Sequence, residues 1–314
     1  MTGYEALRGG AAWIDLSSRA RIAVRGRDRA RLLHNLISNE VKKRGPGSGC
    51  YAFLLSAQGR IQADLTLLVF EDHFLLDAEP ELREKIPQHI RRYIVADQVE
   101  LEDVTAATRA IALEGPQAGQ ALQKAGGAAP GGDYAHLAWQ EAGATVARIS
   151  LTGQPGFRIY ADAGAAEGIV RRMGEAGAQP ATDEDARTVR IENGRPRYGE
   201  DIRDTTLPQE TGQMHALSFN KGCYLGQEIV ERIRAQGHVN RRLVRLRLES
   251  RAPLAAGGRL TADGAEAGEI TSSIYSPAEQ AAVALAYVRA AFAAPGQALV
   301  AGEVPGTVTA VVAA

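Results

Sequence analysis

The 314-residue chain has little cysteine and almost no net charge, and each shortage excludes a class of protein. Its two cysteines, Cys50 and Cys223, cannot build the disulfide framework of a small secreted domain. A formal net charge of -1 gives no overall field that would draw the chain to nucleic acid or to a membrane surface. No apolar run approaches membrane-spanning length, and the N-terminus lacks a charged-then-apolar leader. We therefore expect a cytoplasmic protein with no membrane partner.

Signatures of metal and nucleotide chemistry are also missing. The six histidines show no paired spacing and there is no Cys-x-x-Cys, so we expect no metal site built by this chain alone. The chain has neither a glycine-rich phosphate loop nor a Gly-x-Ser-x-Gly elbow. These absences remove most common enzyme classes.

The hydrophobic pattern predicts an α+β protein with antiparallel sheets. Apolar residues at helical spacing predict a helix over 28–37, and Pro87 is expected to kink or split a second helical stripe over 82–94. Thr182 and Asp185 are spaced as a capping box for a helix over 183–191. The remaining predicted elements are strands over 21–25, 50–55, 61–70, 73–78, 99–104 and 108–113, a strand-rich block over 137–160, and helices over 117–124 and 163–175.

The chain changes character beyond residue 240. Glycines and prolines separate short strand patterns there, and no helix pattern interrupts them. The predicted strands cover 243–248, 258–261, 268–275, 283–288, 298–300 and 307–312. Six short strands without a helix favour a small β-barrel or sandwich. We therefore predict two domains, 1–240 and 241–314.

The most informative segment is 221–228, which reads Lys-Gly-Cys-Tyr-Leu-Gly-Gln-Glu. A predicted helix starts at Gln227 and stops near Gly237. A helix N-terminus and the nearby Lys221 would both favour the thiolate form of Cys223, which is the setting of a reactive cysteine. The alternative is a buried, inert cysteine in a tight turn.

A second segment, 190–201, is rich in charge, proline and glycine. A helix is predicted to end at Gly194, and the turn there presents Glu192, Arg195, Arg197 and Asp201. A carboxylate in such a turn can accept two hydrogen bonds from an aminopyrimidine or guanidinium edge. The alternative is a surface loop with solvated charges.

A basic run follows the cysteine. Between residues 221 and 247 only Glu228 and Glu231 oppose seven cationic side chains, namely Lys221 and arginines 232, 234, 241, 242, 245 and 247. Such a face can hold an anionic tail or a phosphate backbone. The alternative is a solvated strand face, because Arg245 and Arg247 alternate with leucines.

At these residues the chain resembles a known family. The motif Lys-Gly-Cys-Tyr-x-Gly-Gln-Glu is similar to the signature of the YgfZ-type folate-binding proteins. These are relatives of the glycine cleavage T protein and are associated with maintenance of iron–sulfur enzymes. The resemblance runs nearly end to end, through blocks at 26–41, 58–61, 190–201, 207–210 and 268–277.

The resemblance implies a tetrahydrofolate pocket in the N-terminal two thirds, built from two interlocked antiparallel-sheet-plus-helix units, with the barrel appended. It implies that Glu192 reads the pterin ring of tetrahydrofolate or a one-carbon derivative, and that Cys223 and Lys221 carry the chemistry. The basic run would then hold the polyanionic glutamate tail of cellular folates. The other cofactor-binding residues that the resemblance implies are Arg195, Tyr198, Asp201, Tyr224, Gln227 and Glu228.

One departure bears on the branch of the family. The T protein carries an aspartate that assists aminomethyl transfer, and no residue of the comparable stretch, 76–84, can be assigned to that role. The T protein in turn lacks the cysteine motif. We therefore expect a folate-binding protein that supports assembly or repair of iron–sulfur enzymes, with those enzymes or their assembly factors as partners and a link to tRNA modification. The alternatives are a folate-dependent aminomethyl- or methyltransferase, and a non-catalytic adaptor whose basic face binds a protein or tRNA.

Overall fold

The computed structural model describes residues 1–312, and the chain divides into two compact units whose segments alternate along the sequence. Unit 1 comprises Met1–Leu54, Ala63–Val189 and Asn220–Leu225. Unit 2 comprises Leu55–Gln62, Arg190–Phe219 and Gly226–Ala314. This division differs from the one predicted at residue 240, which stays a prediction.

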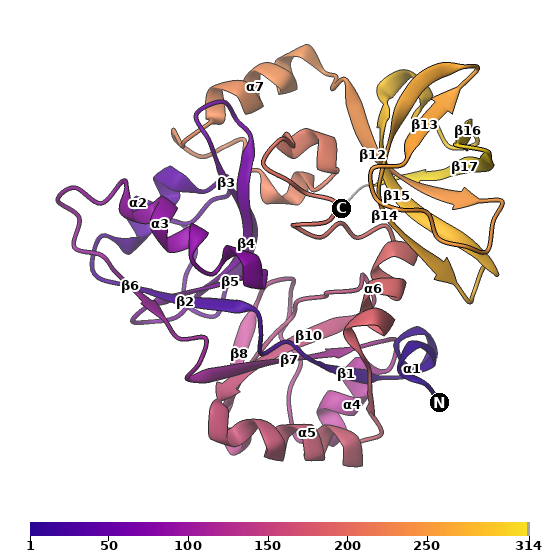
Figure 1. The fold of residues 1–314 in the computed structure, drawn as a ribbon. Helices are drawn as coiled ribbons and strands as arrows, with labels where there is room; N and C mark the ends of the chain where they lie inside the picture. The colour runs from indigo at the N-terminus through magenta and orange to yellow at the C-terminus, as the bar shows by residue number, and fades with distance from the viewer. Residues whose placement is uncertain (313–314) are drawn as a thin grey trace. The chain divides into compact units, whose positions relative to one another are not determined.

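The first sheet of unit 1 has six strands in the order β11-β1-β7-β10-β9-β8. β1 pairs with β11 in parallel, and the other pairs are antiparallel. Figure 1 shows helices α4 (Ala118–Lys124) and α5 (Ala166–Glu175) against this sheet, and Leu122 and Met173 join its apolar core. The strands are β1 (Ala12–Asp15), β7 (Thr108–Glu114), β8 (His136–Trp139), β9 (Ala144–Ala147), β10 (Gly156–Asp162) and β11 (Gln179–Pro180).

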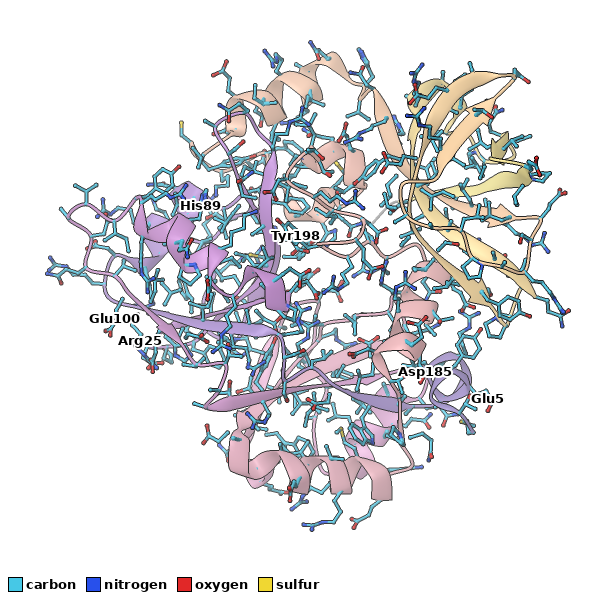
Figure 2. All side chains as sticks on the ribbon, viewed as in Figure 1. Glu5, Arg25, His89, Glu100, Asp185 and Tyr198 are labelled. Carbon is cyan, nitrogen blue, oxygen red and sulfur yellow. The ribbon has the colours of Figure 1, made fainter. Side chains whose placement is uncertain are left out.

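The second sheet of unit 1 has five strands in the order β3-β4-β5-β2-β6. Its edge is marked in Figure 2 by Arg25 and Glu100, which are register partners on β2 and β6. The predicted helical stripe over 82–94 is divided, but not at Pro87. A short 3-10 turn, η1 (Pro80–Leu82), precedes the helix α3 (Lys85–Arg91), and Pro87 lies in the first turn of α3, where its missing amide costs no intrahelical bond. The strands are β2 (Ala20–Arg25), β3 (Gly49–Leu55), β4 (Ile61–Val69), β5 (Phe74–Ala78) and β6 (Glu100–Asp103), and helix α2 (Arg29–Leu36) follows β2.

Two helices of this region carry capping boxes. Helix α1 (Gly3–Gly9) has one at Thr2 and Glu5, and the sequence analysis missed both this helix and β1. Helix α6 (Asp183–Glu192) has the predicted box, since Thr182 Oγ1 accepts a bond from the Asp185 amide at 3.1 Å and Asp185 Oδ2 accepts one from the Thr182 amide at 2.9 Å. The prediction for α6 is therefore confirmed.

Unit 2 contains a closed barrel in the order β12-β15-β14-β13-β16-β17, as the sequence predicted (Figure 1). Alternation along β12 explains the closure, because Val244, Leu246 and Leu248 enter the barrel core whereas Leu243 packs outside it with Ile191. The strands are β12 (Arg241–Leu248), β13 (Arg259–Ala262), β14 (Ala265–Ser276), β15 (Ala281–Arg289), β16 (Ala298–Ala301) and β17 (Val304–Val311).

The remaining elements are short, apart from helix α7 (Gln227–Gln236). α7 starts at the predicted residue and ends at Gly237, whose φ of 73° gives the left-handed cap that the sequence indicated. The 3-10 turns are η2 (Gln140–Ala142), η3 (Ala163–Ala165), η4 (Pro208–Thr211), η5 (Met214–Ala216) and η6 (Ala290–Phe292). Within residues 1–312, none of the helices has the length and apolar composition needed to span a membrane.

Candidate functional site

Glu192 is the last residue of α6 and is held against the barrel within unit 2. Its Oε1 accepts a 2.6 Å bond from Ser276 Oγ at the end of β14, and its backbone carbonyl accepts a 2.8 Å bond from Arg245 Nε. The residue is 8% exposed. A carboxylate anchored in this way has a fixed direction, and a carboxylate offers about four acceptor positions in all.

Asp201, predicted as a folate contact, is fully buried and serves the turn itself. Arg190 Nη1 donates to Oδ2 at 2.7 Å and the Arg197 amide donates to the same oxygen at 3.1 Å. Thr271 and Ser272 of β14 donate to Oδ1 at 2.5 and 2.7 Å. Four donors occupy the carboxylate, so the structure places Asp201 as the link between the 190–201 turn and the barrel. Its contact with folate stays a prediction.

Tyr198 and Arg195 also belong to this turn. Tyr198, labelled in Figure 2, is buried, and its hydroxyl lies 2.6 Å from Asp204 Oδ1 and 2.9 Å from the Gln62 carbonyl. Arg195 is half-buried, and its backbone groups bond to Arg190. The structure therefore brings Glu192, Arg195, Tyr198 and Asp201 into one folded turn of unit 2.

The cysteine motif is divided between the units after Leu225. Lys221 and Tyr224 are buried in unit 1, whereas Cys223 between them is exposed. Gln227 and Glu228 begin α7 in unit 2, where Gln227 is half-buried and Glu228 is exposed. The burial expected in the alternative for Cys223 is therefore wrong, because the side chain lies at the surface, whereas the reactivity of the thiol stays a prediction.

The two arguments for a thiolate at Cys223 need correction. Cys223 precedes the N-cap, Gly226, by three positions, and the field of a helix falls off within its first turn. The ammonium of Lys221 donates to the backbone carbonyls of His34, Ile37 and Asn39. The cation is thus committed to these carbonyls, and its catalytic role stays a prediction.

Gly226, the second glycine of the motif, packs against the turn that contains the block 58–61 named in the family resemblance. Its φ is 81°, and a Cβ placed on it would lie 2.6 Å from the Ser56 carbonyl oxygen and 3.2 Å from the Gly59 Cα. The turn over 56–60 therefore packs directly on the start of α7 within unit 2. Ile61 extends this junction through a 3.0 Å bond from its amide to the Thr206 carbonyl. Only glycine fits at position 226, because the backbone is left-handed and crowded.

The basic run does not form one continuous cationic face. Arg241 pairs with Glu210 at 3.0 Å, and Arg245 and Arg247 both pair with Glu279. Glu210 and Glu279 lie outside the run, which is why the sequence analysis missed this neutralisation. The pairing leaves fewer cations for a ligand than the sequence suggested.

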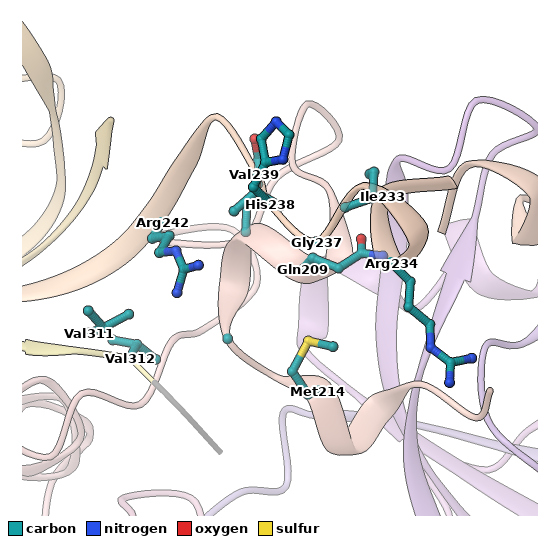
Figure 3. A pocket seen from close by; sticks show the side chains of 12 residues that line it. Gln209, Met214, Ile233, Arg234, Gly237, His238, Val239, Arg242, Val311 and Val312 are labelled. Carbon is teal, nitrogen blue, oxygen red and sulfur yellow. The ribbon is translucent and has the colours of Figure 1, made fainter. Parts of the chain in front are cut away.

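Two arginines of the run line a cavity of about 390 Å³ in unit 2 (Figure 3). Arg242 lies on β12 and Arg234 on α7, and the view shows them on opposite sides of the cavity, with His238 between the two elements. The remaining lining is largely apolar and includes Met214, Ile233, Val239, Val311 and Val312. Gln209 also lines the cavity, as does Glu210, whose charge is paired with that of Arg241. A cavity with apolar walls and cationic groups suits a ligand with an apolar body and a negative charge.

Asp77, in the stretch compared with the T protein's aspartate, is a buried structural group of unit 1. Arg19 Nε donates to Oδ1 at 2.7 Å, Arg158 Nη1 donates to the same oxygen at 2.9 Å, and the Tyr160 hydroxyl donates to Oδ2 at 2.7 Å. Burial raises the pKa of Asp77, but the two arginines more than offset this and the net pKa is lowered. The ionised carboxylate joins β5 to β10.

Asp64 is a buried carboxyl group that the sequence analysis did not single out. It lies on β4 and accepts a 2.7 Å bond from the Tyr51 hydroxyl. Burial, with a contribution from Glu79, raises the pKa of Asp64 to about 6. No sequence signal marks this group, because its burial depends on the packing of the sheet. Across residues 1–312, no group of three or more histidine, cysteine, aspartate or glutamate side chains has an arrangement suited to a metal ion.

Comparison with known proteins identifies the family. The model of the GCVT N-terminal domain matches residues 2–221, and that of the glycine cleavage T-protein C-terminal barrel domain matches residues 241–314. An aminomethyltransferase of Rubrobacter xylanophilus is 33% identical over 290 residues, which cover 91% of this chain and 78% of that protein. An aminomethyltransferase of a Nostoc species is 30% identical over 309 residues, covering 94% and 81% of the two chains.

A solved structure supports the fold. The glycine cleavage system aminomethyltransferase T of Bartonella henselae superposes with a TM-score of 0.87 at 23% identity, covering 98% of this chain and 87% of that one. Fold and sequence define an α+β protein with a closed C-terminal β-barrel. The chain belongs to the glycine cleavage T-protein family.

Proposed function

We propose that this protein binds tetrahydrofolate in unit 2 and transfers a one-carbon group to or from it. The support is the match to both domain models of the family and to relatives that are named aminomethyltransferases. The structural observation that carries the proposal is the placement of Glu192 at a helix end, with its carboxylate fixed by Ser276. These matches support transfer of a one-carbon group more strongly than the iron–sulfur role that the segment 221–228 favoured.

The residues of the 190–201 turn fit a pterin. The ring presents adjacent N–H donors, and a carboxylate accepts such a pair through its two oxygens. The bond from Ser276 and the Arg245 bond to the Glu192 carbonyl hold this acceptor in place before any ligand binds. Tetrahydrofolate would supply the amine that accepts or releases the one-carbon unit.

A titration calorimetry experiment tests the role of Glu192. Glu192→Gln exchanges one acceptor oxygen for a donor and removes the charge, so it should lose about 1.5–3 kcal/mol of tetrahydrofolate affinity. Glu249→Gln is the control, because Glu249 is an exposed carboxylate in the same unit. Unchanged affinity in the Glu192 variant removes this residue from the site.

A transfer assay separates the proposed enzyme from a binding protein. The protein is incubated with tetrahydrofolate and an aminomethyl donor, and the folate product is examined by mass spectrometry. A one-carbon-substituted folate is the expected product in the wild type. A protein that binds tetrahydrofolate but forms no product has a different role, and one that does not bind folate agrees with the non-catalytic adaptor.

A second candidate function is favoured by the exposure of Cys223 in a segment where Lys221 and Tyr224 are buried. In the narrower YgfZ-type assignment, this thiol supports assembly or repair of iron–sulfur enzymes, with a link to tRNA modification. Cys223→Ser keeps the size of the side chain and loses the nucleophile. The variant should fold and bind folate, but it should fail to restore iron–sulfur enzyme activities in a knockout strain. Full complementation by the serine variant contradicts this candidate.

A further inference from the structure

Lys221 occupies an unusual place for a cation. It is 7% exposed, and its ammonium donates to three backbone carbonyls, those of His34, Ile37 and Asn39, the last two at 2.7 and 2.8 Å. These carbonyls lie in the last turn of α2 and immediately after it, where a helix leaves carbonyl groups without intrahelical partners. The three donors of an ammonium match three acceptors, so the ammonium caps this end of α2.

The surroundings of Lys221 reinforce this placement. The ring of Tyr224 lies beneath the ammonium, with the nitrogen 4.8 Å from the ring centroid. Burial lowers the pKa of Lys221 to about 8, while Glu40 and the Cys50 thiol oppose the shift and Lys42 adds to it. His34 also faces this region, with Nδ1 3.1 Å from Glu40 Oε1. An acidic neighbour, an aromatic face and three carbonyls all favour a cation at this position.

The same contacts fix a short piece of chain. Asn220–Leu225 belongs to unit 1, although the chain on both sides of it belongs to unit 2. Lys221 holds one end of this piece, and the Leu225 amide holds the other through a 3.0 Å bond to the Asn35 carbonyl. Cys223 lies between these two anchors and is exposed.

We propose that Lys221 is a positioning residue, whose ammonium anchors the segment 220–225 to the end of α2 so that the Cys223 thiol is presented at a fixed place on unit 1. The side chain does not act as a nucleophile or as a proton donor toward a ligand, because its three donors are occupied inside the protein. The proposal does not depend on folate binding or on the reaction.

Chemical labelling of the wild-type protein provides the first test. Reductive methylation at pH 8, quantified for each lysine by mass spectrometry, compares Lys221 with the exposed Lys42, Lys43 and Lys124. An accessible amine with a lowered pKa would react first, whereas an anchored ammonium should react at least about 100-fold more slowly than the exposed lysines. Labelling of Lys221 at the rate of the exposed lysines overturns the proposal.

Hydrogen exchange provides the second test. Lys221→Met keeps an unbranched side chain that is one atom shorter and removes the donors, so exchange at the Leu225 amide should accelerate at least about tenfold. Lys43→Met, which removes an exposed lysine nearby, should leave Leu225 unchanged. The Ala121 amide in α4, bonded to the Gln117 carbonyl at 2.9 Å, is an internal reference within unit 1.

The outcomes separate a local anchor from other roles. Faster exchange at Leu225 with no change at Ala121 supports the proposal. Unchanged exchange at Leu225, or equal acceleration at both amides, overturns it, and if Lys221→Met does not fold the labelling result decides. Tetrahydrofolate affinity is measured in parallel for the wild type and for Lys221→Met. A wild type that does not bind folate counts against the proposed function and leaves the anchoring role of Lys221 untouched.

Discussion

At the scale of single residues, burial divides groups that look alike in the sequence. Cys50 and Cys223 are both single cysteines near basic residues, but Cys50 is buried and Cys223 is exposed. The strand predicted over 50–55 begins at Cys50, and the observed strand β3 begins one residue earlier, at Gly49. The burial of Glu192 and Asp201 was not predictable, because both carboxylates accept hydrogen bonds from hydroxyl groups of β14, far along the chain.

The two thiols should react at very different rates. Burial raises the pKa of Cys50 to about 11, against a reference near 8.5, so its thiolate is rare at neutral pH. We expect iodoacetamide to alkylate Cys50 at least about 100-fold more slowly than Cys223, as followed by mass spectrometry of the separate peptides. A Cys223→Ser variant should lose the fast phase. Comparable rates at the two cysteines contradict the assigned burial.

Ionisation of the buried Asp64 carboxyl group should lower the free energy of unfolding as the pH rises. Its pKa is raised from 3.8 to about 6 in the folded state, so the folded protein binds more protons between these values than the unfolded chain does. Its contribution is therefore favourable at and below pH 3.8 and is lost as the pH rises through 6. Asp64→Asn should remove this dependence and should gain about 1–3 kcal/mol in the free energy of unfolding at pH 7 relative to the wild type.

Denaturant unfolding at pH 4, 5.5 and 7 checks the Asp64 prediction. Asp133→Asn, at an exposed position of unit 1, controls for the loss of one negative charge. A variant at position 64 that is less stable than the wild type at pH 7 would show that the ionised carboxylate contributes favourably there.

At the scale of elements, local signals predicted more than pairing did. The cap of α6 and the ends of α7 follow from residues close in sequence, and the structure confirms them. β1 and β11 were missed because they are short, and Ala12 and Trp13 pair with residues 179 and 180, far along the chain. No local pattern in four residues indicates such a partner.

The two glycines of the cysteine motif should differ in their tolerance of alanine. Gly226 combines a φ of 81° with contacts of under 3 Å to a placed Cβ, whereas a Cβ on Gly222 would meet nothing within 4 Å. Gly226→Ala should therefore lose about 1–3 kcal/mol of stability, and Gly222→Ala should be close to neutral. Thermal or denaturant unfolding of the two variants gives the comparison. Equal losses of stability in the two variants would contradict the prediction that the contact of α7 with the 56–60 turn requires glycine at position 226.

At the scale of the whole molecule, composition and pattern predicted the fold class but not the way the chain is shared between units. The α+β class and the six-stranded closed barrel agree with prediction. The return of 220–225 to unit 1 was not visible, because it depends on Lys221 finding carbonyls that follow α2. The basic run was likewise predicted to form one cationic face. Glu210 and Glu279, which pair with its arginines, lie outside the run in sequence, so the pattern did not indicate this neutralisation.

The cavity in unit 2 gives the predicted interaction with the folate tail a definite form. Arg234 and Arg242 line the cavity, while Arg232, on the same helix as Arg234, is exposed and is not part of the lining. If the glutamate tail binds here, triglutamyl tetrahydrofolate should bind about 2–5-fold more tightly than the monoglutamate at low salt, since partly exposed pairs each contribute about 0.2–1 kcal/mol. The advantage should vanish near 0.5 M salt, because exposed charges are screened.

Arginine variants connect that advantage to the cavity. Arg242→Gln and Arg234→Gln should each reduce the triglutamate advantage and leave monoglutamate affinity nearly unchanged, whereas the matched control Arg232→Gln should keep the full advantage. Glu192→Gln should instead weaken both folates equally, because it acts on the pterin. Calorimetry at two salt concentrations distinguishes these patterns. Equal affinity for the two folates at low salt contradicts tail binding, and an equal loss in all three arginine variants would point to a general field of the surface.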